Sequence, residues 1–534
     1  MSSSKARGTK PPRTSSQGVG SRDFRRRAQR TRQEAARKNQ RRARSFSRPQ
    51  WSLRGTLRRV PLAAWMCAAV ACLNAVAWSV ITPPFQVPDE PEHIAYVKQL
   101  AETGRLPASK GNFSLEEGLA LEGTRLQTVA RKPQFKPIGT QAEERKLQAD
   151  LQRGRRSSER GSEYVGVAST QPPLYYALEA VPYTLGRGGT LLDRIELMRL
   201  LSALMAGVTA LFAFMFLREA LSRVRWAWIV GGLGVALVPL LGFSSGAVNP
   251  DALLFAVTAG LLFALARGFR RGATQKLMIA IGAAIAIGFA TKLNFVGLAP
   301  GALLGLVILG VRAVKAEGRR AYRWLAIALA IALAPPALYS ISHLASGRPA
   351  FGIVSRGLGV SHGLWAEINY IWELYLPRLP GMHVDFAGIM PARQLWFHGY
   401  VGLYGWLDTT FPGWVYELAL ALAVPIGGLC LRSLIGSAGE LRKRIGELAV
   451  YAVMCAGLLI LIGADSYLQF PHTNAEYAQA RYLLPLLPLL GAILALAARG
   501  AGRRWGPAVG AAIVMLFLAH DVFSQLQVVA RYYG

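Results

Sequence analysis

The stretch VPLAAWMCAAVACLNAVAWSVIT, residues 60–82, carries no charged side chain. As a helix it would rise by about 34 Å, enough to cross the hydrocarbon core of a bilayer, which is about 30 Å thick. Ten more apolar stretches follow, at 195–217, 225–243, 251–267, 276–291, 295–311, 323–343, 413–431, 446–464, 482–498 and 505–524. The chain is therefore predicted to be an all-α, polytopic integral membrane protein with about eleven transmembrane helices.

Positive charge lies almost wholly on one side of this predicted bundle. The 534 residues have a formal net charge of +31, and residues 1–59 alone hold 19 Lys or Arg and 2 Asp or Glu. Every loop on the same side is basic, namely 218–225, 267–276, 312–323, 432–447 and 499–504. Tail and loops together have a net charge of +32, and the rest of the chain has −1. The positive-inside rule therefore predicts a cytoplasmic N-terminus and a C-terminus outside the plasma membrane.

The segment 1–59 is polar and rich in arginine, and we predict a disordered cytoplasmic tail. Its basic region is too long for a cleavable signal peptide. Contact with anionic inner-leaflet lipids is its simplest role. Nucleic acid is not favoured as a partner, because the basic residues are not interleaved with aromatic ones. The predicted transmembrane domain covers 60–524, followed by a short outer tail at 525–534. Outer loops are expected at 83–193, 344–412 and 465–481.

The first stretch leads into TPPFQVPDEPEHIAYVKQLAETGRLP, residues 82–107, which is predicted to form a short amphipathic helix along the outer surface. Asp89 and Glu92 match the spacing of a capping box. A cap needs one acid, whereas Asp89, Glu90, Glu92 and His93 place four ionisable groups in five positions. Asp89 and Glu90 are therefore candidate catalytic residues, able to take a proton from a hydroxyl or to hold a divalent cation. His93 is a candidate for binding the substrate.

Other outer segments carry polar or aromatic residues that suit substrate binding. Gln171, in STQPPLYYALEAVPYTL (169–185), is a candidate for hydrogen bonding to a sugar, and Tyr175 suits either a substrate or an interfacial anchor. Asn249 and Asp251, in SSGAVNPDALL (244–254), lie where a helix begins, so Asn249 could equally be its cap. The aromatic-rich loop 344–412 suits the membrane interface or stacking on sugar rings.

Two cations lie at outer ends of spans, where the topology does not require them. Lys292 joins the fifth and sixth stretches, and a lysine costs roughly 2.5–3.5 kcal/mol near the bilayer centre and less toward the interface. It could snorkel to headgroups or bind an anion. Arg481 opens the tenth stretch, in NAEYAQARYLLPLLPLL (474–490). Lys292 and Arg481 are predicted to form a cationic pair suited to a phosphate.

Five motifs at outer span ends, taken in order, resemble a known family. They are P-D-E-x-x-H at 88–93, Q-P-P-L-Y-Y at 171–176, N-P-D at 249–251, T-K at 291–292 and R-Y-L-L-P at 481–485. The acidic pair and the Pro-Pro-Leu-Tyr-Tyr segment are similar to those of the GT-C superfamily of polyprenyl-phosphate-sugar-dependent glycosyltransferases. The closest resemblance, over about 83–490, is to a bacterial family of predicted GT-C-like membrane proteins of undefined substrate.

The resemblance implies a sugar transferase acting on the outer face, with inversion at the anomeric carbon. Asp89 would be the general base and Glu90 a helper or metal ligand, while Lys292 and Arg481 would stabilise the departing lipid phosphate. The donor would be a polyprenyl-phosphate-linked sugar, and the acceptor a glycan, lipid or protein of the cell envelope. No cofactor is certain, and a divalent cation is one option. The chain carries no large soluble domain after the spans, so the acceptor would be held by loops at 100–170 and 344–412.

Three other functions are compatible with a multi-spanning chain. A transporter or flippase of lipid-linked glycans predicts charges near the bilayer midplane and paired broken helices in two similar halves. Here the polar residues gather at outer span ends, and no internal repeat is evident. A non-catalytic scaffold for envelope assembly would leave Asp89 dispensable. An outer-face polymerase or ligase of lipid-linked glycans would differ from a sugar transferase mainly in the size of its donor.

Overall fold

Long apolar helices dominate the computed structural model. It describes residues 60–107, 110–137, 140–155, 160–165, 167–221, 224–345, 364–380, 382, 391–473 and 478–534. The predicted disordered tail at 1–59 lies outside these residues. Within them, nine helical segments are long and apolar enough to span a membrane. They are α3 (Leu62–Ile81), α9 (Leu191–Ala220), α12 (Asp251–Arg271), α14 (Phe295–Glu317), α15 (Arg320–Ala345), α19 (Gly413–Ile435), α21 (Ile445–Thr473, apolar to Leu468), η4 with α22 (Ala480–Leu486, Leu487–Gly500) and α23 (Gly502–Tyr533).

The remaining two predicted spans are helical but differ from simple crossings. Helices α10 (Arg225–Ala236) and α11 (Pro239–Ser245) are bent by 51° at their junction, where Pro239 lacks an N–H and restricts the residue before it. Helix α13 (Gln275–Thr291) has 17 residues, about 26 Å of rise, and falls just short of the hydrocarbon thickness. The all-α, polytopic class is confirmed, whereas the exact count of eleven is not.

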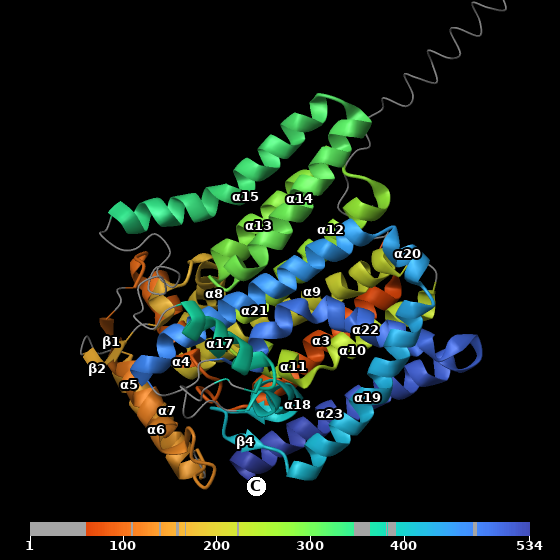
Figure 1. Ribbon diagram of the computed structural model, residues 1–534. Coiled ribbons are helices and arrows are strands. Elements are labelled where there is room, and N and C mark those ends of the chain that lie inside the picture. Colours follow the sequence, from red (N-terminus) through yellow and green to blue (C-terminus); the bar gives the residue numbers. More distant parts are fainter. Residues whose placement is uncertain are drawn as a thin grey trace, which may run out of the picture. The chain divides into compact units, whose positions relative to one another are not determined.

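The first outer loop is a small folded layer, and in Figure 1 its elements gather at one end of the helices. In order they are α4 (Glu90–Thr103), β1 (Lys110–Ser114), α5 (Leu115–Gly123), α6 (Leu126–Val129), α7 (Gln141–Gly154), β2 (Arg160–Val165), η1 (Val167–Thr170), α8 (Leu174–Leu185) and η2 (Gly186–Gly188). Strands β1 and β2 pair antiparallel. The short helix predicted after the first span is present as α4, but it is covered by protein: it is buried from His93 to Lys98 and packs on α8.

The loop between α15 and α19 contains α17 (Leu364–Tyr375), the π-helical turn η3 (Arg393–His398), α18 (Gly399–Gly402), β3 (Leu403–Tyr404) and β4 (Thr409–Thr410). Several of its aromatic residues pack inside the protein. Trp406 Nε1 donates to the Phe85 carbonyl oxygen at 2.9 Å, and Trp396 Nε1 donates to that of Leu374 at 2.7 Å. Trp365 is 77% exposed and alone among these three remains free for an interfacial role.

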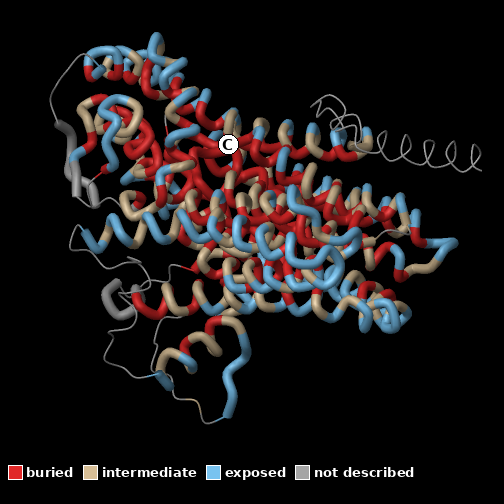
Figure 2. Tube along the Cα trace, turned by 90° about the horizontal axis from the view of Figure 1, so that it is seen from above, coloured by how far each residue is buried: buried red, intermediate tan, exposed pale blue. Residues whose placement is uncertain are grey.

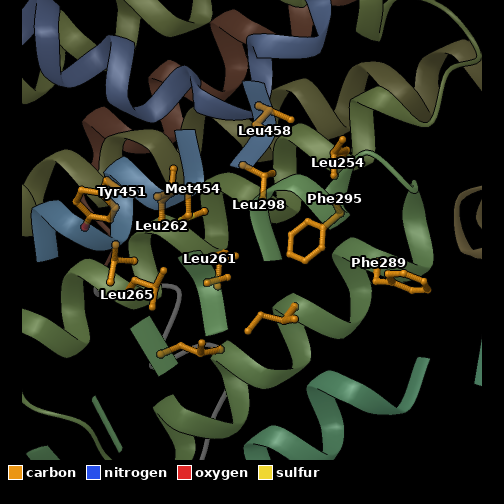
Figure 3. Packing of buried hydrophobic residues seen from close by; sticks show 14 of the residues in the cluster. Leu254, Leu261, Leu262, Leu265, Phe289, Phe295, Leu298, Tyr451, Met454 and Leu458 are labelled. Carbon is orange, nitrogen blue, oxygen red and sulfur yellow. The ribbon is translucent and has the colours of Figure 1, made fainter. Parts of the chain in front are cut away.

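The largest apolar core joins α12, α13, α14 and α21. Figure 3 shows the side chains of this cluster, including Leu261, Phe289, Phe295, Met454 and Leu458. Helices α14 and α21 approach closely at two glycines, because a Cβ on Gly457 would lie 2.2 Å from the Gly297 carbonyl oxygen. Figure 2 shows buried residues filling the interior, with exposed residues along the outer helices. The spans of α15 and α19 are only 11% buried, as expected of lipid-facing helices.

The basic loops lie at the opposite end of the helices from the first-loop layer. Helices α12 and α14 begin near that layer and end at the basic segments around Arg271 and Glu317. Arg271 pairs with Glu219 of α9 at 2.7 Å, and Arg444 Nη1 donates to the Ala220 carbonyl oxygen at 2.7 Å. The helix ends that the charge pattern predicts to be cytoplasmic therefore contact one another. The residues expected to form a C-terminal tail are the last turns of α23.

Candidate functional site

Four charged side chains from distant segments meet at the end of the helices that carries the first-loop layer. Asp89 precedes α4, Asp251 opens α12, Lys292 lies between α13 and α14, and Arg481 lies in η4. Lys292 Nζ donates to Asp251 Oδ1 at 2.7 Å, and Arg481 Nη2 donates to Asp89 Oδ2. Arg481 Nε lies 3.9 Å from Asp251 Oδ2. We call these four residues the charged quartet.

The members of the quartet differ sharply in accessibility. The side chains of Asp251, Lys292 and Arg481 are 2%, 8% and 4% exposed. Asp89 is 44% exposed, although protein atoms closely surround it. Its carboxylate thus keeps an accessible surface that the other three members lack. Asp89 is thus the member of the quartet that an entering molecule could reach first.

Burial and charge set the protonation states around Asp89. Burial raises the pKa of Asp89, but the attraction of Arg481, with a smaller contribution from Lys292, outweighs it and holds the pKa below its usual value. Asp89 is therefore a carboxylate at neutral pH. Burial lowers the pKa of His93 to about 3, so its ring is neutral, and its Nδ1 lies 3.0 Å from the Tyr176 hydroxyl. Burial also lowers the pKa of Lys292 despite its contact with Asp251.

The local backbone turns Asp89 away from the alternative role of a helix cap. Its φ of 70° is in the left-handed region, and its side chain accepts no hydrogen bond from the helix. Glu92 accepts one from the Ala168 backbone N–H at 3.1 Å instead of completing a capping box. The capping interpretation is therefore wrong, because the left-handed backbone directs the carboxylate toward Arg481 rather than toward the first turn of α4.

Glu90, adjacent in sequence, lies in a closed environment. It is fully buried, and Arg199 donates to both of its oxygens, from Nε at 2.8 Å and from Nη2 at 2.7 Å. The backbone N–H groups of Phe85 and Val248 donate to it at 2.9 and 3.1 Å. With both oxygens occupied, Glu90 is suited to holding the loop in place. Its partners are Arg199 and two backbone N–H groups rather than members of the quartet, and its part in catalysis stays a prediction.

Two residues at this site were not predicted. Arg199 also donates to the backbone carbonyl oxygens of Thr82 and Pro83, at 2.7 and 3.2 Å. An arginine within the apolar stretch 195–217 was a signal for such a role. Tyr482, in the R-Y-L-L-P motif, has its ring centroid 5.5 Å from both Lys292 Nζ and the Arg481 guanidinium carbon. Its ring face helps to hold both cations.

The other predicted binding residues fall into two groups. Asn249 Oδ1 accepts from the N–H of the quartet member Asp251 at 2.9 Å, and Gln171 Oε1 accepts from the N–H of Leu293, the residue after Lys292, at 3.1 Å. Tyr175 points elsewhere, because its hydroxyl lies 2.8 Å from Ser202 Oγ, which donates to Glu179. The neighbouring Tyr176 contacts His93 in its place.

A small apolar pocket borders Arg481. Its volume is about 50 Å³, and its lining includes Pro88, Leu240, Phe243, Leu395, Gln479 and Arg481. Along the residues that the structure describes, no three His, Cys, Asp or Glu side chains are arranged to hold a metal ion. The divalent cation therefore stays a prediction, and the chemistry available at the site is that of one accessible carboxylate and two buried cations.

Residues 72–490 match the family described as predicted membrane protein DUF2142. No curated protein matches the chain. The chain is similar to ArnT from Cupriavidus metallidurans, at 15% identity and a TM-score of 0.42 over 82% of this chain and 60% of ArnT. It is also similar to ArnT bound to undecaprenyl phosphate, at 15% identity and a TM-score of 0.40 over 81% of this chain and 59% of ArnT.

A further similarity is to the oligosaccharyltransferase of Archaeoglobus fulgidus, at 12% identity and a TM-score of 0.41 over 88% of this chain and 56% of that protein. The chain therefore spans less than two thirds of the length of each of these proteins. At these identities and TM-scores the similarities give no information on chemistry.

Proposed function

This chain belongs to the family of predicted membrane proteins DUF2142, and we propose that it is a membrane glycosyltransferase. It moves a sugar from a polyprenyl-phosphate donor to an acceptor of the cell envelope, on the outer face of the plasma membrane. The observation that carries this proposal is the quartet: an accessible carboxylate, Asp89, lies beside two buried cations, Lys292 and Arg481. A base next to an anion-binding pair is what transfer from a lipid phosphate to a hydroxyl needs.

The proposed reaction is a single displacement. The acceptor hydroxyl oxygen forms a bond to the anomeric carbon, while the bond from that carbon to the phosphate oxygen breaks and its electrons pass to the phosphate. Asp89 takes the hydroxyl proton and later gives it to water. Lys292 and Arg481 offset the charge on the leaving lipid phosphate. Attack from the side opposite the phosphate inverts the anomeric carbon.

The arrangement of charge favours a transferase over a transporter. A transporter needs its polar residues near the midplane, between two similar halves. Here the quartet lies where α12 and α14 begin and α13 ends, which is one end of the helices. A scaffold would not need the carboxylate of Asp89 at all, so the role of that side chain separates the proposals.

Replacing Asp89 by Asn tests the transferase. The variant should reach normal membrane levels. Cells carrying it should lack the transferred sugar on their surface glycans and should accumulate the lipid-linked donor, both measured by mass spectrometry. Asp150→Asn is the control, because Asp150 pairs with the exposed Arg153 within α7, away from the quartet. Unchanged glycans with no build-up of donor in cells carrying Asp89→Asn would overturn the proposal.

A further inference from the structure

We propose that Asp89 occupies the anion-binding position of Arg481 in the ligand-free protein, and that an entering lipid phosphate displaces it. The carboxylate that is displaced is then free to act as the base. The inference rests on the proposed function and adds how its site is switched on: the substrate's own phosphate releases the base. The argument depends on which members of the quartet stay in place, Asp251, Lys292 and Arg481, and which one can move away, Asp89.

Accessibility identifies the group that leaves. Asp251 and Lys292 form a buried pair at 2.7 Å with side chains 2% and 8% exposed, so separating them would leave charge in a poorly solvated place. Asp89 is 44% exposed and can be solvated when it turns away from Arg481. The exchangeable partner of Arg481 is therefore Asp89 and not Asp251.

Arg481 stays in position without Asp89. Its Nη1 donates to the Pro88 carbonyl oxygen at 3.2 Å, and its guanidinium carbon lies 5.5 Å from the Tyr482 ring centroid. Its Nε has no hydrogen-bond partner among the described residues, and neither has Asp251 Oδ2, 3.9 Å away. A phosphate presents oxygens to a guanidinium much as a carboxylate does, so one anion can replace the other.

Charge balance favours exchange over simple addition. The quartet holds two cations and two carboxylates, and the buried His93 beside it is neutral. Adding a phosphate while Asp89 stays on Arg481 would leave an excess negative charge within the protein.

Exchange also explains how a strongly paired carboxylate could serve as a base. The attraction of Arg481 is the main force that keeps the pKa of Asp89 below its usual value. A carboxylate so paired is a poor proton acceptor. Once the phosphate holds Arg481, that attraction is shared and Asp89 becomes more basic, at the moment when the donor is in place.

Binding of farnesyl monophosphate to the purified full-length protein in detergent tests the exchange. Asp89→Asn and Asp89→Ala remove the internal competitor, so both should bind the probe about tenfold more tightly than the wild type. Arg481→Gln should abolish binding. Asp408→Asn is the matched control, because Asp408 pairs with Arg531 at 3.0 Å, with both side chains 5% exposed, and should bind as the wild type does.

Two further ligands separate the parts of the probe. Farnesol should bind equally to all variants, and inorganic phosphate should show the same order of affinities as farnesyl monophosphate if the phosphate alone drives the exchange. Equal or weaker binding of farnesyl monophosphate by both Asp89 variants overturns the proposal, and so does an absence of binding by every variant. Thermal melts identify any variant that is misfolded.

The outcomes distinguish this proposal from the transferase itself. If Asp89→Asn loses glycan transfer but binds farnesyl monophosphate no more tightly, the transferase stands and the exchange fails. If Asp89→Asn binds it more tightly while the cell's glycans are unchanged, the exchange stands and the transferase fails.

Discussion

Two neighbouring carboxylates, Asp89 and Glu90, illustrate how far the surroundings of a residue decide its role. Glu90 is closed in by four donors and fully buried, whereas Asp89 keeps 44% of its side chain accessible and pairs with Arg481. The left-handed backbone at Asp89 sends the two side chains in different directions. Of the acidic pair, Asp89 therefore has the geometry of a base and Glu90 that of an anchor.

His93 gives a prediction about pH. Its pKa is lowered to about 3 in the folded protein from 6.5, so between these values the unfolded chain binds a proton that the folded protein does not. Folded stability should therefore be complete above pH 6.5 and fall by about 1.4 kcal/mol per pH unit below it. In thermal melts in detergent from pH 7 to 5, the wild type should lose more stability than His93→Gln.

Groups other than His93 titrate in both proteins, so the difference between the two melting series isolates this residue. Equal losses of stability in the wild type and in His93→Gln would show that His93 is protonated in the folded protein and contradict its buried, neutral state.

At the scale of elements, Arg199 of α9 ties together three segments. It pairs with Glu90 at the start of α4 and donates to the carbonyl oxygens of Ser79, Thr82 and Pro83, where α3 ends. Through Val248, Glu90 also holds the turn before α12. We call the pair of Arg199 and Glu90, with its backbone partners, the clamp. It fixes the chain after Asp89, and the hydrogen bond from Arg481 to the Pro88 carbonyl oxygen fixes the chain before it.

Breaking this clamp should be severe. Arg199→Met leaves Glu90 buried without its partner, and we expect a loss of roughly 3–5 kcal/mol in the free energy of unfolding. Adding Glu90→Leu to Arg199→Met should recover much of it, since no buried charge then remains unpaired. Thermal unfolding in detergent measures both, with Arg153→Met, from an exposed pair, costing at most about 1 kcal/mol. A melting temperature of Arg199→Met equal to the wild type's would rule the clamp out.

At the scale of the whole molecule, the chain separates two chemistries to opposite ends of its helices. The first-loop layer gathers at one end of the helices (Figure 1). The quartet lies at the same end, and the basic loops lie at the other, where Arg271 and Arg444 contact α9. The positive charge of these loops is therefore far from Lys292 and Arg481. This separation is why Lys292 and Arg481 are the candidates for binding an anionic substrate.

The predicted orientation is open to a labelling test. In a chain with its four cysteines replaced by alanine, single cysteines are placed by Gly413→Cys, at the quartet end, and Gly439→Cys, in a basic loop; both positions are exposed. A membrane-impermeant maleimide applied to intact cells should label Gly413→Cys alone. Labelling of Gly439→Cys alone would reverse the orientation and place the quartet in the cytoplasm.

Local patterns in the sequence predicted much of this architecture. Hydrophobic length located all eleven helical segments to within a few residues at most ends, because burying apolar side chains in lipid is a local requirement. Three features of the helices were not predicted: the 51° bend at Pro239, the shortness of α13 and the burial of α4. They depend on how each helix packs against other helices.

The sequence by itself determined which ends of the spans carry polar residues, and so it identified Asp89, Asp251, Lys292 and Arg481 as candidates. Only the tertiary structure decided how they are used: which carboxylate pairs with which cation, that Glu90 is closed off by Arg199, and that Tyr175 points to Ser202 while Tyr176 contacts His93. The physical reason is that charge and apolar length follow from the local sequence, whereas pairing and accessibility depend on residues far apart in the chain, such as Pro88 and Arg481, 393 positions apart.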